Sequence, residues 1–287
     1  MNSRRQESLA RVALGSAACL TVAVMLAITG QVLASGLSHV SPAFLLEAPR
    51  SMGREGGILP TIISTAYLTT VALAVASPLS IGAAVYLAEY ARRGRLVQGI
   101  RFATESLAGV PSIIFGLFGF SVFVLKLGMG WSVLSGGLTL ALMILPTMVR
   151  ATEEALQSVP ARYREGSLAL GASRWQTVTR VVLPSALPGI ATGVILSVGR
   201  AVGETAAVLL TAGSALGVPQ SLGDPARSMA VHLYILASEG ISMDRAYATG
   251  SVLVILVVLV NAATNYLGRR RVPGRRKHAW SRPSSSA

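Results

Sequence analysis

The chain has 287 residues, of which 52% are hydrophobic and 13% are charged, whereas about a quarter of the residues of ordinary soluble domains are charged. Its mean hydropathy is +0.60, and this composition argues against a soluble globular protein. The net charge of +13 would suit a nucleic-acid-binding protein. The distribution of the basic residues, described below, argues against a nucleic-acid partner.

Long runs without charged residues recur along the chain. A helix needs about 20 mostly apolar residues to cross the hydrocarbon core of a bilayer. Six runs meet this need, and the fifth is interrupted only by Arg200 and Glu204. We therefore expect an all-α membrane protein with six transmembrane helices, at residues 12–34, 60–84, 103–125, 132–150, 183–212 and 247–267.

The basic residues separate by side once the spans are numbered. With a cytoplasmic N-terminus, 19 of the 25 Lys and Arg residues fall in inner segments and 5 in outer segments. This asymmetry follows the positive-inside rule. It predicts a multi-pass protein of the plasma (inner) membrane with both termini cytoplasmic.

Composition divides the chain into three parts. Residues 1–59 hold a cytoplasmic N-terminus, the first transmembrane helix and an external segment; the apolar run is longer than the roughly 7–15 residues of a cleaved signal peptide. Residues 60–267 form the transmembrane core, in which Pro78, Pro146 and Gly109-Val110-Pro111-Ser112 predict kinked helices. The basic tail 268–287 is expected to lie against anionic membrane lipid.

The cytoplasmic loop 150–182 carries helix punctuation. Pro160 suits the start of a helix and Gly171 its C-terminal stop. Ser173 and Gln176 have the spacing of a capping box, which begins a second helix. The pattern predicts a helix, a tight turn and a helix, and favours a docking element over a plain linker.

This loop resembles the EAA loop of ABC importer permeases. Glu165-Gly166-Ser167 is followed by three residues, Gly171, nine residues and Val181-Val182-Leu183-Pro184. The family pattern is Glu-Ala-Ala, three residues, Gly, nine residues and Ile-x-Leu-Pro, so Gly166 and Ser167 replace the two alanines. The resemblance implies the type I ABC importer permease fold.

Further segments are similar to the phosphate permeases of this family. They are Ala108–Phe118, Arg150–Glu154, Tyr163–Glu165 and Gly199–Thr205, and Asp224-Pro225 with His232–Tyr234 looks more like the A-type subunit than the C-type. The resemblance implies a phosphate importer assembled with an ABC ATPase subunit, a second homologous permease subunit and an external phosphate-binding protein. A permease for sulfate or molybdate, or the C-type phosphate subunit, is the alternative.

In the family, the EAA loop forms a coupling helix that enters a groove of the ATPase. Glu165, Leu168, Ala169 and Ala172 have the spacing of one helix face. The resemblance implies ATPase coupling through Tyr163, Arg164, Glu165, Leu168, Ala169, Gly171 and Ala172.

Arg200 and Glu204 are expected to lie on one face of the fifth helix, four residues apart, where they can meet. A charge at mid-bilayer costs about 2.5–3.5 kcal/mol, so both should face protein or water. They could form a structural ion pair, but Arg suits phosphate oxygens, and the resemblance implies a translocation path through both. Arg150 is a second path candidate or snorkels to the interface. Thr205 could donate its hydroxyl to the path or to its own helix.

No ATP-binding P-loop is found, because neither Lys126 nor Lys277 follows a Gly-x-x-x-x-Gly turn. We therefore expect a transporter subunit without a cofactor or enzyme activity, with ATP hydrolysis supplied by a partner. A secondary carrier and a membrane enzyme are rival interpretations; the first would need no coupling loop and the second would need a catalytic constellation.

Overall fold

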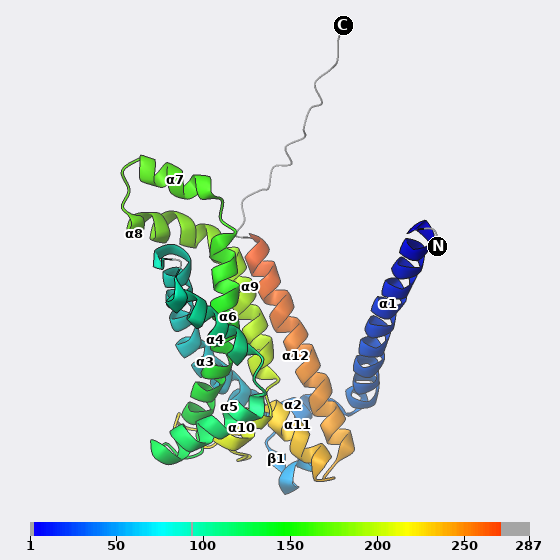
Figure 1. The fold of residues 1–287 in the computed structure, drawn as a ribbon. Coiled ribbons are helices and arrows are strands. Elements are labelled where there is room, and N and C mark those ends of the chain that lie inside the picture. The colour runs from blue at the N-terminus through cyan, green and yellow to red at the C-terminus, as the bar shows by residue number, and fades with distance from the viewer. Residues whose placement is uncertain (1–2, 93, 271–287) are drawn as a thin grey trace.

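The computed structural model describes residues 3–92 and 94–270 (Figure 1). The α-helices are α1 (Ser3–Gly36), α2 (Pro42–Leu46), α3 (Leu59–Val85), α4 (Arg95–Ala108), α5 (Ser112–Gly119), α6 (Val133–Gln157), α7 (Ala161–Ala169), α8 (Arg174–Thr177), α9 (Leu183–Val202), α10 (Ala206–Thr211), α11 (Met229–Ser238) and α12 (Met243–Arg270). Short π-helical turns extend the helices at Tyr86–Tyr90, Phe120–Lys126 and Val178–Val182. A 3-10 turn lies at Leu37–His39 and another at Ser51–Gly53, and the strands β1 (Pro49–Arg50) and β2 (Glu55–Gly56) pair antiparallel, with Pro49 opposite Gly56.

Five helical segments are long and apolar enough to cross a membrane. They are Ala10–His39, Leu59–Tyr90, Val133–Gln157, Arg174–Val202 and Met243–Ala262. These segments confirm an all-α membrane protein and match five of the six predicted spans. The basic tail beyond residue 270 lies outside the described residues, as does Arg93.

The third predicted span, 103–125, is not one straight helix. It is formed by α4 and by α5 with its π-helical extension, and the two parts are bent by 101°. Pro111 explains the break, because it has no N–H to donate and disfavours helical backbone in the preceding residue. Only if this bent pair counts as one span does the number of candidate spans reach six.

The fifth predicted span, 183–212, ends early. Helix α9 stops at Val202, Gly203 is its C-cap, and α10 begins at Ala206 as a separate short helix. At its other end the span begins sooner than predicted, because α8, the π-helical turn and α9 run on without a break. The fourth span is also longer than predicted, since α6 continues seven residues past Arg150.

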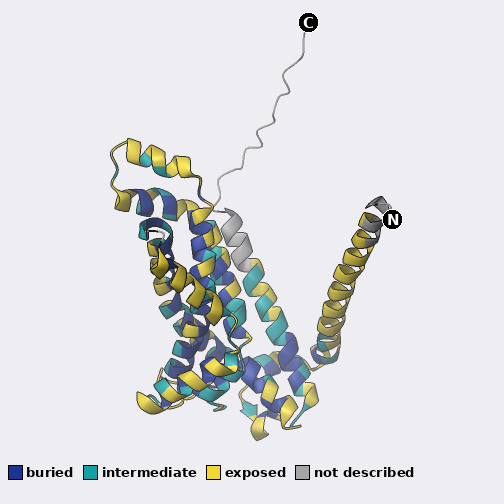
Figure 2. Cartoon of the chain, in the orientation of Figure 1, coloured by how far each residue is buried: buried dark blue, intermediate teal, exposed yellow. Residues whose placement is uncertain are grey.

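Helices α3, α6 and α9 lie side by side at the centre of the molecule (Figure 1). Two thirds of the apolar window of α6 is buried (Figure 2), the most of any candidate span. Gly136 and Gly137 allow α3 to approach closely, because a side chain there would overlap Leu68 or Val71. Helix α1 contacts α12 near its C-terminal end and is exposed along its apolar window, as expected for a surface that faces lipid or another subunit.

Candidate functional site

The segment after α6 forms an exposed projection at one end of the molecule (Figure 1). Helix α7 begins after Pro160, and Ser173 caps α8. The Ser173 hydroxyl accepts a hydrogen bond from the Gln176 N–H at 3.3 Å, and the Gln176 side chain accepts one from the Ser173 N–H at 2.8 Å. This pair of bonds confirms the predicted capping box and the predicted sequence of helix, turn and helix.

The turn between α7 and α8 is a Schellman motif centred on Gly171. The Gly171 N–H donates to the Leu168 carbonyl at 3.0 Å, and the Ala172 N–H donates to the Ser167 carbonyl at 3.2 Å. Gly171 has a φ of +82°, where a side chain is disfavoured. Because α7 ends at Ala169, the prediction that Ala172 shares its helix face is wrong.

The projection is largely exposed (Figure 2), and several of its exposed residues are large and apolar. We call the exposed side chains Tyr163, Leu168, Leu170 and Trp175 the tip patch; Leu170 is 90% exposed and Trp175 is 65% exposed. Glu165 and Ala169 are exposed beside it. Leu170 and Trp175 were not predicted as coupling residues, although an exposed Leu and Trp in a polar loop are a readable signal.

Arg164 points inward, unlike its neighbours on α7. Its Nε and Nη2 donate to Glu89 at 3.0 and 2.6 Å, Nη2 also donates to the Leu156 carbonyl at 2.8 Å, and Nη1 donates to the Val159 carbonyl at 2.7 Å. The guanidinium is thus engaged within the chain. Glu89, to which the sequence assigned no role, is 8% exposed.

The structure does not pair Arg200 with Glu204. Arg200 lies in the last turn of α9, and its Nη1 donates to the Thr147 hydroxyl of α6 at 3.4 Å. Glu204 lies beyond the end of α9, and its Oε1 accepts a hydrogen bond from the Ala207 N–H at 3.2 Å, at the start of α10. The predicted shared helix face is therefore wrong, because Gly203 ends the helix between the two residues. Thr205 follows in the same break and precedes α10.

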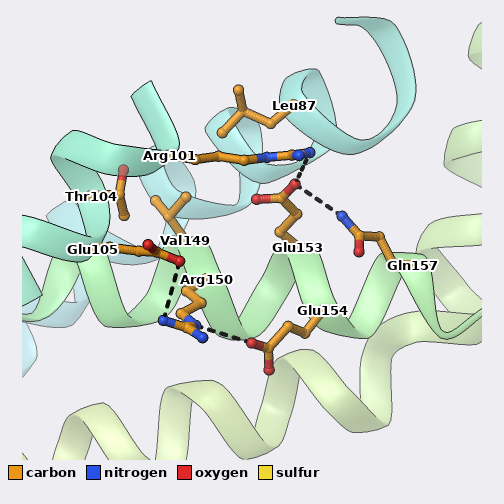
Figure 3. Close-up of a pocket in the computed structure, with 9 residues that line it drawn as sticks. All are labelled: Leu87, Arg101, Thr104, Glu105, Val149, Arg150, Glu153, Glu154 and Gln157. Carbon is orange, nitrogen blue, oxygen red and sulfur yellow. Dashed lines mark hydrogen bonds and ion pairs between the residues drawn. The ribbon is translucent and has the colours of Figure 1, made fainter. Parts of the chain in front are cut away.

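Arg150 lines a groove of about 200 Å³ between α4 and α6 (Figure 3). Its Nε donates to Glu154 at 3.1 Å and its Nη1 lies 3.5 Å from Glu105 of α4. Deeper in the groove, Glu153 accepts hydrogen bonds from Arg101 and from Gln157. The carboxylates of Glu105 and Glu154 therefore compete with any anion that approaches Arg150.

Thr147 joins these two arginines structurally. It precedes Arg150 by three residues on α6, so the two side chains lie about one helical turn apart. Arg200 therefore contacts α6 at a position one turn away from Arg150. Among the described residues, no group of three or more His, Cys, Asp or Glu side chains could hold a metal ion.

Comparison with known protein families places a match over most of the chain. Residues 76–276 match the model of the binding-protein-dependent transport system inner membrane component. This range contains α4 to α12, and with them the α7–α8 projection and the contacts of Arg200 and Arg150.

Individual relatives and solved structures agree with that match. The chain is 36% identical over 284 residues to the probable ABC transporter permease protein YqgI of Bacillus subtilis (strain 168), covering 93% of this chain and 97% of the relative. It is 37% identical over 226 residues to the phosphate transport system permease protein PstA 1 of Mycobacterium tuberculosis (strain H37Rv), covering 76% and 73%. A chain of a bacterial alginate ABC transporter superposes with a TM-score of 0.65 at 16% identity, covering 93% of this chain and 98% of that one.

Proposed function

The chain belongs to the family of binding-protein-dependent transport system inner membrane components and is an ABC importer permease subunit; from this premise we propose that it is the A-type permease of an ATP-driven phosphate importer. Relatives named phosphate transport system permease protein support this substrate; among them, PstA of Pasteurella multocida (strain Pm70) is 34% identical over 233 residues.

The observation that carries the proposal is Arg200 at the end of a transmembrane helix. A guanidinium presents a planar fork of donors, which suits the oxygens of a phosphate ion. One guanidinium nitrogen of Arg200 donates to the Thr147 hydroxyl. Among the described residues, neither Glu204 nor any other acidic side chain forms an ion pair with Arg200, so its other nitrogens have no carboxylate partner.

Transport needs release as well as binding. At Arg150 the carboxylates of Glu105 and Glu154 compete for the guanidinium. We propose that phosphate passes from Arg200 along α6 to Arg150, where these carboxylates displace it. Thr205 lies in the break after α9 and belongs to the same path as a hydroxyl donor.

We further propose that the α7–α8 projection docks into an ABC ATPase subunit that supplies ATP hydrolysis. Docking through the tip patch would bury its exposed apolar side chains, and Glu165 and Ala169 lie beside it. A second homologous permease subunit and an external phosphate-binding protein complete the assembly. The beginning of α1, the α7–α8 projection and the end of α12 lie at the same end of the molecule (Figure 1), which supports a cytoplasmic location for both termini.

The test is labelled phosphate uptake by a strain that lacks this gene. The strain is restored with the wild type or with Arg200→Ala, in micromolar phosphate with excess sulfate. Rescue by the wild type alone, unaffected by sulfate, is the expected result. Equal rescue by both would reduce Arg200 to a structural residue, and no rescue by a protein confirmed in the membrane would favour sulfate or molybdate as the substrate.

A further inference from the structure

Glu89 and Arg164 form a partly buried ion pair between two segments that are 75 residues apart in the sequence. The Glu89 carboxylate accepts from Arg164 Nε at 3.0 and 3.2 Å and from Nη2 at 2.6 Å. Only 8% of the Glu89 side chain and 24% of the Arg164 side chain are exposed. A bidentate, charge-assisted pair of this kind has a fixed geometry.

The same guanidinium also binds the end of α6. It donates to the Leu156 carbonyl at 2.8 Å and to the Val159 carbonyl at 2.7 Å. Carbonyls in the last turn of a helix lack the usual partner within the helix, and Arg164 adds a charged donor at the Leu156 carbonyl, which also accepts from the Val159 N–H at 3.3 Å. One side chain on α7 therefore joins the end of α6 to the π-helical turn that ends α3.

A second contact reinforces the attachment. The guanidinium of Arg174, in α8, lies 5.3 Å from the centre of the Tyr90 ring, in the same π-helical turn as Glu89. The hydroxyls of Ser167 and Thr177 are 2.9 Å apart and hold α7 to α8. Both arginines of this attachment line a groove of about 310 Å³ with Glu89, Leu168, Thr177 and Val178.

The covalent connections of the α7–α8 projection lead only to α6 and α9. Without Glu89, the projection would be held to the end of α3 only by the Arg174–Tyr90 contact and by packing. Breaking the pair would leave a charge in a poorly hydrated place, which is strongly unfavourable. The pair is therefore suited to stay closed and move as one body.

We propose that Glu89 is a positioning residue for energy coupling, which fixes the α7–α8 projection to the end of α3 through Arg164. Movement imposed on the projection then reaches α3 directly, as well as α6 and α9. This inference rests on the proposed function, since it needs an ATPase partner that moves the projection.

The test compares Glu89→Gln with Glu89→Gln/Arg164→Gln in the complete transporter, reconstituted with its ATPase and binding protein. The measured quantity is phosphate carried per ATP hydrolysed, with co-purification of the ATPase as the check on assembly. We expect both variants to assemble and to hydrolyse ATP. The amount of phosphate carried per ATP should fall about tenfold in each, an effect of the size found for mutations that alter the coupling between two sites. Glu7→Gln is the control, because Glu7 forms an exposed ion pair with Arg11 on α1.

The double variant separates coupling from folding. If the single variant is impaired only because Arg164 is left unpaired, the double variant, which has neither charge, will carry phosphate normally and the inference is overturned. Normal phosphate per ATP in both variants overturns it as well. If the single variant does not reach the membrane, the double variant decides. Failure of the proposed function appears in the wild type, which would carry no phosphate however much ATP it hydrolysed.

Discussion

Thr147 on α6 accepts a hydrogen bond from Arg200 on α9, at 3.4 Å between the hydroxyl oxygen and Nη1. The bond crosses the packed interface between two central helices. It takes the place of the Arg200–Glu204 pair that helical spacing predicts, because Glu204 lies past the end of α9. The orientation of the guanidinium thus depends on α6, the helix that also carries Arg150.

Thr147→Val should therefore weaken phosphate uptake without removing the protein from the membrane. The substitution keeps the shape and removes the acceptor, at a cost of about 0.5–1.5 kcal/mol for one hydrogen bond. We expect the KM for phosphate to rise roughly twofold to tenfold, which corresponds to that energy. Thr147→Ser keeps the hydroxyl and is the control. An unchanged KM for the valine variant would mean that packing alone orients Arg200.

Glu204 tests whether the path needs its charge or only its oxygen. Its Oε1 caps the start of α10 through the Ala207 N–H. Glu204→Ala should lower stability by about 1 kcal/mol, as for other lost helix caps, and Glu204→Gln should preserve both stability and uptake because the amide oxygen can accept the same bond. Thermal unfolding of the purified protein and phosphate uptake measure the two effects. Slow phosphate release by the glutamine variant at normal stability would instead show that the Glu204 carboxylate weakens the binding of phosphate to Arg200.

Gly171 is required for the turn of the projection. At a φ of +82° an L residue other than Gly costs about 1–2 kcal/mol, so Gly171→Ala should weaken co-purification of the ATPase and phosphate uptake together. Gly171→Asn should be milder, since Asn tolerates this conformation. Gly166→Ala is the matched control: Gly166 lies within α7, and nothing is within 4 Å of its added Cβ. Equal loss in the control would show that the effect is not one of backbone conformation.

The sequence predicts those parts of the structure that have a local cause. Charge-free runs predict five long helices, and Ser173 with Gln176 predicts the capping box, because the required residues are close together in the chain. The break after Val202 has weaker local signals, since apolar residues continue on both sides of Gly203-Glu204-Thr205. Hydropathy alone merges α9 and α10 into one span.

Long-range contacts leave no such signal. Nothing near Glu89 indicates that Arg164 reaches it, and nothing near Arg200 indicates Thr147, because both contacts depend on how distant helices pack. Arg164 lies in the motif that predicts a partner-facing helix, yet its side chain turns inward to carbonyls at and just after the end of α6. Position on a helix can be read from spacing, whereas the direction in which a long side chain folds cannot.

The contacts of Asp224 predict that the stability of its loop, at the end of the molecule opposite the projection, depends on pH. Its carboxylate accepts from the N–H groups of Gln220 and Ser221 at 2.7 and 2.8 Å, and these bonds, with the Ser221 hydroxyl, lower the pKa of Asp224 below its ordinary value of 3.8. The Asp224 carbonyl also accepts from the Val133 N–H at the start of α6. Because the pKa of Asp224 is depressed in the folded protein, its ionised carboxylate contributes fully to folding stability above the pKa of the unfolded state. This stabilisation is lost as the pH falls through the lower pKa of the folded state.

We therefore expect amide hydrogen exchange at Gln220 and Ser221 to be slow at neutral pH, once corrected for intrinsic rates. Protection should fall only below the ordinary aspartate pKa. Asp224→Ala removes the acceptor and should remove protection at neutral pH, and Asp244→Ala, on an exposed side chain of α12, should not. Persistence of protection in Asp224→Ala would show that the backbone bonds to α6 suffice to hold the loop.

Gly119 tests the packing of α5 on α6. A Cβ at this position would overlap the Thr139 side chain, which is fully buried and bonded to the Ser135 carbonyl. Gly119→Ala should lower stability by about 1–3 kcal/mol, the usual cost of overpacking, and reduce the amount of protein in the membrane. Thr139→Ala in the same chain should restore part of the loss, because it removes the two atoms nearest the new methyl group. Gly82→Ala is the control in α3, where nothing lies within 4 Å of the added Cβ. Wild-type stability of Gly119→Ala would mean that α5 can move away from α6, so that the bend at Pro111 acts as a joint and not as a fixed corner.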